Sequence, residues 1–140
     1  MPALLVWHFA VTCVLCGLIW TIQLLHYPLM ADVGAESFSA YHLAHTRNIT
    51  PLVGPLMLFE LASGAWLWLD GQRSPAFLLS LGLLALVWIS TALLQVPLHH
   101  QLAGGFDPAV HARLVHSNWI RTLAWSGRLL CLVPAFLARP

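Results

Sequence analysis

Histidine is the residue type in this chain with the greatest capacity for chemistry, with eight copies in 140 residues. His42 and His45 lie three residues apart in a stretch that predicts a helix, so both side chains occupy one helical face and can ligate one metal ion or two adjacent ions. His26 and His99 each follow a long apolar run. We therefore expect the metal ligands to be histidines from both halves of the chain: His26, His42, His45, His99 and His111.

Neighbouring histidines cannot all reach the same ion. His99 and His100 are about 100° apart around a helix, so we expect only one to point inward, and the spacing from Pro97 favours His99. His111 and His116 are five residues apart, about 140° around a helix, and we do not expect them to share an ion. Imidazole ligands suit iron, copper or zinc, and we favour iron or copper.

Glu60 and Arg128 are charged residues in the middle of apolar segments, where charge is costly and commonly functional or paired. One interpretation is an ion pair that holds two helices together. The other makes Glu60 a metal ligand, with Arg128 free to bind an anionic or quinone-like substrate. Arg121 is either an interfacial anchor or an inward-pointing side chain beside the histidines. The candidate catalytic residues are Glu60, Arg128, Arg121 and Tyr27, which adjoins His26.

The composition predicts that membrane-spanning helices position these residues. Hydrophobic residues make up 59% of the chain and charged residues 8%, against roughly 25% charge in a soluble domain. A span needs about 20 mostly apolar residues, and four segments meet this requirement: 4–26, 49–69, 75–97 and 118–138. We predict an all-α, integral membrane four-helix bundle that occupies residues 1–140 as a single domain.

The predicted spans also sort the histidines. Both termini and the short 70–75 turn share one membrane face, whereas the connections 27–48 and 98–117 share the other. Seven histidines belong to this second face, and only His8 lies toward the first. We therefore expect imidazoles from both halves of the molecule to converge at one end of the bundle.

A short internal repeat supports two tandem helical hairpins with interfacial histidine-bearing segments. Pro28 and Pro97 each follow a helix and are expected to break it. His42 and His111 come fourteen residues after these prolines, and Asn48 and Asn118 then stand in favoured N-cap positions. Gln23 and Gln95, just before the two prolines, are expected to hydrogen-bond across helices. The repeat suggests a pseudo-twofold axis along the membrane normal.

Several features limit the remaining function classes. A net charge of +1 gives no reason to expect nucleic acid as a partner. Cys13, Cys16 and Cys131 lie in apolar runs and are interpreted as packing residues. The first run lacks a charged leader and a small-residue cleavage pattern, so we interpret it as a retained helix. No C-x-x-C-H motif is present, which excludes covalent c-type haem, and haem b remains an alternative cofactor.

The chain resembles a group of small, mostly uncharacterised bacterial four-helix membrane proteins in four motifs. These are Ile19-Trp20-x-x-Gln23-Leu24-Leu25-His26-Tyr27-Pro28-Leu29, Tyr41-His42-x-x-His45, Gln95-x-Pro97-Leu98-His99 and Asn118-Trp119-Ile120-Arg121-Thr122. The last motif also resembles, more distantly, the opening of the final helix in the anthrone-oxygenase-like family. That resemblance implies oxygen-dependent oxidation of a hydrophobic aromatic compound. This chain is richer in histidine than that family, which suggests a metal-dependent mechanism instead.

We therefore expect a metal-dependent membrane oxidoreductase of oxygenase or oxidase type that acts on a small hydrophobic substrate at a histidine-rich site. The alternatives are a haem or metal carrier or transporter, and a non-catalytic protein whose histidines sense pH. The expected partners are the lipid bilayer, the substrate and further copies of the chain. The expected location is the bacterial inner membrane, with the orientation left open.

Overall fold

The computed structural model describes residues 3–137, and the described part is all-helical, as predicted. Four continuous helical rods follow one another along the chain. The first joins α1 (Ala3–Thr21), the π-helical segment η1 (Ile22–His26) and α2 (Tyr27–Met30). The second is α3 (Ala35–Leu69). The third joins α4 (Pro75–Ser90), the π-helical segment η2 (Thr91–Gln95) and α5 (Val96–Leu102). The fourth is α6 (Pro108–Leu137).

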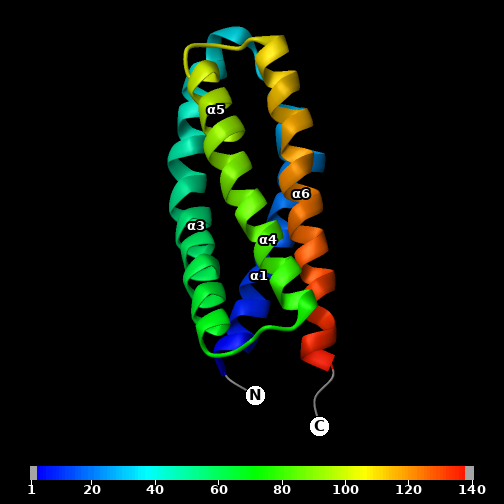
Figure 1. The fold of residues 1–140 in the computed structure, drawn as a ribbon. Helices are drawn as coiled ribbons and strands as arrows, with labels where there is room; N and C mark the ends of the chain where they lie inside the picture. The colour runs from blue at the N-terminus through cyan, green and yellow to red at the C-terminus, as the bar shows by residue number, and fades with distance from the viewer. Residues whose placement is uncertain (1–2, 138–140) are drawn as a thin grey trace.

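The four rods lie side by side and run alternately up and down (Figure 1). α1 packs against α3 and α6, and α4 packs along α6. The start of α1, the end of α6 and the turn between α3 and α4 lie at one end, while the other two connections lie at the opposite end. This alternation is the one predicted from the order of the apolar segments.

The predicted connections 27–48 and 98–117 are wrong, because helix occupies most of both ranges. The connections are residues 31–34 and 103–107 only. Asn48 and Asn118 therefore lie inside α3 and α6 and are not N-caps. Asp107 fills that role for α6, since its Oδ1 accepts hydrogen bonds from the backbone N–H groups of Ala109 (2.8 Å) and Val110 (3.1 Å). The Asp-Pro sequence at 107–108 was the signal for this start.

Pro28 and Pro97 do not break their helices, contrary to prediction. Each is preceded by a π-helical segment, in which Tyr27 N donates to Ile22 O and Val96 N donates to Thr91 O. Proline has no N–H, and its ring collides with the carbonyl four residues earlier in a regular α-helix. The wider π turn accommodates the ring and lets the helix continue. The two segments begin 69 residues apart, as do Pro28 and Pro97, so the predicted repeat recurs in the backbone.

The predicted short turn between the second and third rods is confirmed. Ser74 caps α4 by accepting a hydrogen bond from Phe77 N at 3.3 Å, and Pro75 takes the first helical position. Gly71 has φ of +96°, a conformation that favours glycine.

Apolar side chains pack in three levels along the rods. The middle level, here called the middle apolar layer, draws from all four rods and includes Leu15, Ile19, Met57, Val87 and Trp125. A second level lies at the end that carries most histidines and includes Tyr27, Met30, Phe38, Leu98 and Leu114. The third lies at the opposite end. The cysteines are free, and Cys16 packs in the middle apolar layer, as interpreted from the sequence.

Three of the rods are long and apolar enough to cross a membrane: Ala3–Met30, Ala35–Leu69 and Pro75–Leu102. The fourth predicted span, 118–138, is not among them, and its last residue lies outside the described residues. α6 is less apolar because it carries Asn118, Arg121, Thr122 and Arg128, and all four of these side chains are buried between the rods.

Candidate metal centre and adjoining cavity

Three rods bring four histidines together at one end of the molecule: His26 from η1, His42 and His45 from α3, and His99 from α5. We call these four residues the histidine cluster. His42 Nε2 and His99 Nδ1 share a hydrogen bond of 3.0 Å. The other nitrogen of His99, Nε2, hydrogen-bonds the Tyr27 hydroxyl at 3.0 Å. Both nitrogens of His99 are thus positioned by side chains from other rods.

His45 and His26 complete the cluster. The centroid of the His45 ring lies 5.8 Å from that of His99 and 6.5 Å from that of His42. The His26 ring stacks on His45 with centroids 4.3 Å apart. His26 Nε2 and His42 Nδ1 are buried and have no hydrogen-bond partner among the described residues. Two buried nitrogens with unused bonding capacity therefore lie within one group of imidazoles.

The observed ring orientations hold the cluster together by hydrogen bonding and stacking. No group of three or more histidine, cysteine, aspartate or glutamate side chains within residues 3–137 is arranged as a metal site. The spacing of the two bonded nitrogens in the His42–His99 pair is close to that of two ligands of one ion. Two nitrogens that each lie about 2.0–2.1 Å from one tetrahedral ion are roughly 3.3 Å apart, and these two are 3.0 Å apart. Because they point at each other, both rings would have to rotate to point at a common ion.

The remaining histidines lie outside the cluster. His100 and His116 are exposed, so the choice of His99 as the inward member of its pair is confirmed. His111, a predicted ligand, is buried and bonds through Nε2 to the backbone oxygen of Tyr27 at 2.8 Å. This bond joins α6 to the end of the first rod. His111 thus lies outside the cluster, and its Nε2 is occupied by the bond to the Tyr27 backbone.

A cavity of about 230 Å³ adjoins the histidine cluster between α3 and the η2–α5 part of the third rod. Its wall is mostly apolar, and its polar members include Tyr27, His45, His99 and Arg121. It reaches the surface beside Thr50 and Val96, both of which are exposed. A second cavity of about 410 Å³ shares His99 with the first and also touches His42 and His100. His99 therefore lines both cavities.

Arg121 is buried beside this cavity, with 7% of its surface exposed. Its Nη1 donates to Asn118 Oδ1 at 3.3 Å, its guanidinium lies 5.2 Å from the centroid of the Trp125 ring, and it interacts with the Tyr27 hydroxyl. Its Nε has no partner, and no acidic side chain pairs with it in the part of the chain that is described. Of the two predicted roles of Arg121, the structure supports the inward-pointing one.

Gln23 and Gln95 fasten the two π-helical rods to α6, as predicted. Gln23 Oε1 accepts from Asn118 Nδ2 at 2.9 Å, and Gln23 Nε2 donates to Val115 O at 3.2 Å. The Gln95 amide fits best with its nitrogen donating to Ser90 O at 3.0 Å and its oxygen accepting from Ser117 Oγ at 2.9 Å. Gln95 also lines the cavity, so its hydrogen bonds fix part of the cavity wall.

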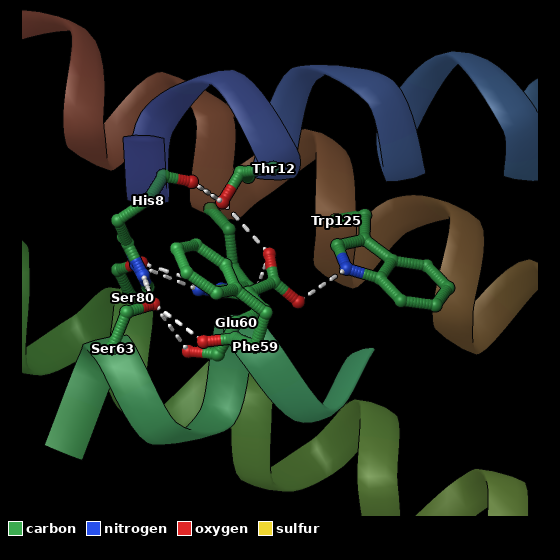
Figure 2. Close-up of polar contacts among 8 residues, drawn as sticks. His8, Thr12, Phe59, Glu60, Ser63, Ser80 and Trp125 are labelled. Atoms are coloured by element: carbon green, nitrogen blue, oxygen red, sulfur yellow. Dashed lines mark hydrogen bonds and ion pairs between the residues drawn. The ribbon is translucent and has the colours of Figure 1, made fainter. Parts of the chain in front are cut away.

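Glu60 lies in a separate buried network farther along α3, nine residues before the helix ends at Leu69 (Figure 2). Both Glu60 and Arg128 are fully buried and form an ion pair. The Glu60 carboxylate also accepts hydrogen bonds from Thr12 Oγ1 (2.7 Å) and Trp125 Nε1 (3.1 Å). Fifteen residues of α3 separate Glu60 from His45, roughly 22 Å along a helix. Glu60 therefore cannot bind the same ion as His45, and the ion-pair interpretation is the one that the structure bears out.

The same network includes residues whose part the sequence reasoning missed. His8 Nε2 lies 3.3 Å from Arg128 Nη2, and His8 Nδ1 lies 2.8 Å from Ser63 Oγ. Ser80 Oγ accepts from Arg128 Nε at 3.4 Å. The available signal was helical spacing: His8 and Thr12 are four residues apart, and Glu60 and Ser63 are three apart, so each pair lies on one face of an apolar helix.

Comparison of the chain with protein-family models, with curated protein sequences and with solved structures found no match to any of them.

Proposed function

We propose that this chain is an integral membrane four-helix bundle whose histidine cluster binds a transition-metal ion and uses it to oxidise a small hydrophobic compound. The observation that carries the proposal is the His42–His99 pair. Two imidazole nitrogens face each other at 3.0 Å, and a tyrosine hydroxyl holds the far nitrogen of His99. Metal-ligating histidines commonly donate the second ring N–H to such a partner, which fixes ring orientation and tautomer.

The hydrogen bond between His42 and His99 uses only two of the four imidazoles in the cluster. His45 lies within reach of the pair as a third ligand, and His26 stacks on His45 as a fourth candidate. An all-imidazole set suits iron, copper or zinc, and only iron and copper supply a change of oxidation state. His111 and Glu60 leave the proposed ligand set because each is bonded elsewhere in the structure.

The distribution of exposed residues supports membrane insertion. Exposed apolar side chains, such as Leu58, Leu79, Leu93 and Leu130, cover the middle of the rods. Exposed charged residues lie only toward the two ends within the described chain. On the second rod, Arg47 and Asp70 are 23 residues apart, roughly 34 Å of helix, which matches a hydrocarbon core of about 30 Å. α6 spans as well in this proposal, because its central charges face inward.

Oxidation, as opposed to storage or transport, is supported by the cavity. The cavity beside His45 and His99 has apolar walls and reaches the lipid-facing surface, so a hydrophobic compound can enter from the membrane. The choice of oxygen as oxidant comes from the resemblance of residues 118–122 to the anthrone-oxygenase-like family.

Metal analysis of protein purified without a histidine tag tests the proposal. We expect about one equivalent of iron or copper per chain and its loss in the His42→Ala/His45→Ala variant. The matched control is His100→Ala/His116→Ala, which removes two exposed histidines outside the cluster and should retain the metal. Full metal content in the first variant would refute the assignment, and a Soret band would identify haem b in place of a bare ion. Oxygen uptake by the chemically reduced, metal-loaded protein then tests the oxidase chemistry.

A further inference from the structure

Arg121 is a buried cation for which the described part of the chain supplies no counter-ion. Arg128, the other buried arginine, is paired with Glu60 and bonded to Ser80. Arg121 has one side-chain hydrogen bond, to Asn118, at a long 3.3 Å, together with the Trp125 ring and the Tyr27 hydroxyl. Burying a charge without an opposite partner is costly. A ligand that carries a negative charge into the neighbouring cavity removes that cost.

The shape of the cavity limits what that ligand can be. A cavity of about 150 Å³ accepts benzene, so 230 Å³ holds one substituted ring or an apolar group of similar size. Its walls include Ile22, Ile49, Val53 and Met57, which suit an apolar body. A guanidinium presents its donors in a fork that matches a carboxylate.

We propose that the cavity between α3 and η2 binds a small organic carboxylate with an apolar body about one ring in size, and that Arg121 holds the carboxylate. The apolar body then lies along α3, and the carboxylate lies on the Arg121 side of the cavity, near Tyr27 and His99. Calling this ligand the substrate rests on the proposed function, whereas binding itself does not require a metal.

Gly54 provides a way to close the cavity without touching Arg121. It lines the cavity, and a Cβ added to it meets no atom within 4 Å. Because Gly54 lines the cavity, we expect a leucine at this position to reduce the space open to the ligand. Gly82 on α4 is the matched control, because an added Cβ there also meets nothing within 4 Å but the residue does not line this cavity.

The test is binding of benzoate to the metal-free protein in an uncharged maltoside detergent, measured by calorimetry or by equilibrium dialysis. Benzamide serves as the uncharged probe of nearly the same shape. We expect saturable binding of benzoate to the wild type and to Gly82→Leu, and at least tenfold weaker binding of benzamide. Gly54→Leu and Arg121→Gln should each weaken benzoate binding at least tenfold.

Equal binding of benzoate and benzamide, or undiminished benzoate binding to Arg121→Gln, would overturn the proposal. So would undiminished binding to Gly54→Leu, or the absence of saturable benzoate binding to the wild type. Because the sample is metal-free, the outcome is independent of the metal analysis. Metal without benzoate binding leaves the metal centre standing and removes this ligand class, and benzoate binding without metal does the reverse.

Discussion

The Tyr27 hydroxyl determines which nitrogen of His99 faces His42. Its bond to His99 Nε2 leaves Nδ1 turned toward His42, and Tyr27 itself is 3% exposed and held between the rods. A ring held at both nitrogens has little freedom to rotate. If the His42–His99 pair binds an ion as proposed, its geometry depends on a residue that need not contact the ion.

We predict that Tyr27→Phe lowers metal affinity by about 10–100-fold, the usual effect of removing such a supporting bond. The fold should persist, because the ring still fills its place and one hydrogen bond contributes about 0.5–1.5 kcal/mol. Competition with a chelating dye measures the affinity. Tyr41→Phe is the control, since this ring stacks near His26 with centroids 6.1 Å apart and the structure gives its hydroxyl no hydrogen bond. Equal losses in both variants would contradict a special role for Tyr27.

At the scale of the element, the two π-helical segments determine how the side chains after each proline are rotated around the helix axis relative to those before it. Their lining residues, Ile22, Thr91 and Gln95, all face the cavity. π turns inside α-helices are frequent at functional sites. In this chain the cause is local, because each π segment ends two residues before a proline.

We predict that Pro97→Ala converts η2 into regular α-helix and turns His99 away from His42. Stability against thermal unfolding should rise, because proline inside a helix costs about 3 kcal/mol relative to alanine, while metal affinity should fall. Pro51→Ala is the matched control: Pro51 is exposed within α3, where no π segment precedes it, so stability should rise with metal affinity unchanged. Unchanged metal affinity in Pro97→Ala would show that η2 does not position His99.

Across the whole molecule, polar contacts join the rods at several depths. The Glu60–Arg128 network draws side chains from α1, α3, α4 and α6, so it ties all four rods together. The histidine cluster and the Gln23 and Gln95 bonds join the same rods at the other end. In a membrane, where apolar surfaces supply little drive for helix association, such contacts give the rods their register.

We predict that Glu60→Gln and Arg128→Met each destabilise the protein by about 3–5 kcal/mol, because each leaves an unpaired buried charge. The double variant should lose less than the sum of the two, because the residues are in contact. Unfolding in mixed detergent measures these changes. Glu36→Gln, an exposed control in the first turn of α3, should stay within about 0.5 kcal/mol. Folded Glu60→Gln should keep its metal, because Glu60 lies roughly 22 Å along α3 from His45.

Much of the fold was readable in the sequence because apolar runs and short breaker turns are local signals. They predicted the helical class, the alternation of the rods, the 70–75 turn and the gathering of seven histidines at one end. The choice of His99 over His100 also followed from helical spacing. The helix ends could not be predicted in this way. Pro28 and Pro97 were expected to break their helices, which is the usual effect of proline. Whether a helix breaks or widens at a proline depends on the residues that pack around it.

Only the tertiary structure decided which polar residues meet. Sequence reasoning places a side chain on a face of its own helix, but the relative rotation and depth of the four rods decide whether that face meets a partner. Glu60 and His45 share α3 yet belong to separate sites, because a helix rises about 1.5 Å per residue. Arg121 and Arg128 share α6, and among the residues that the structure describes only Arg128 meets a carboxylate. Residue types in the sequence determined which reactions and ligands are chemically possible. The packing of the four rods determined where in the molecule the polar side chains come together.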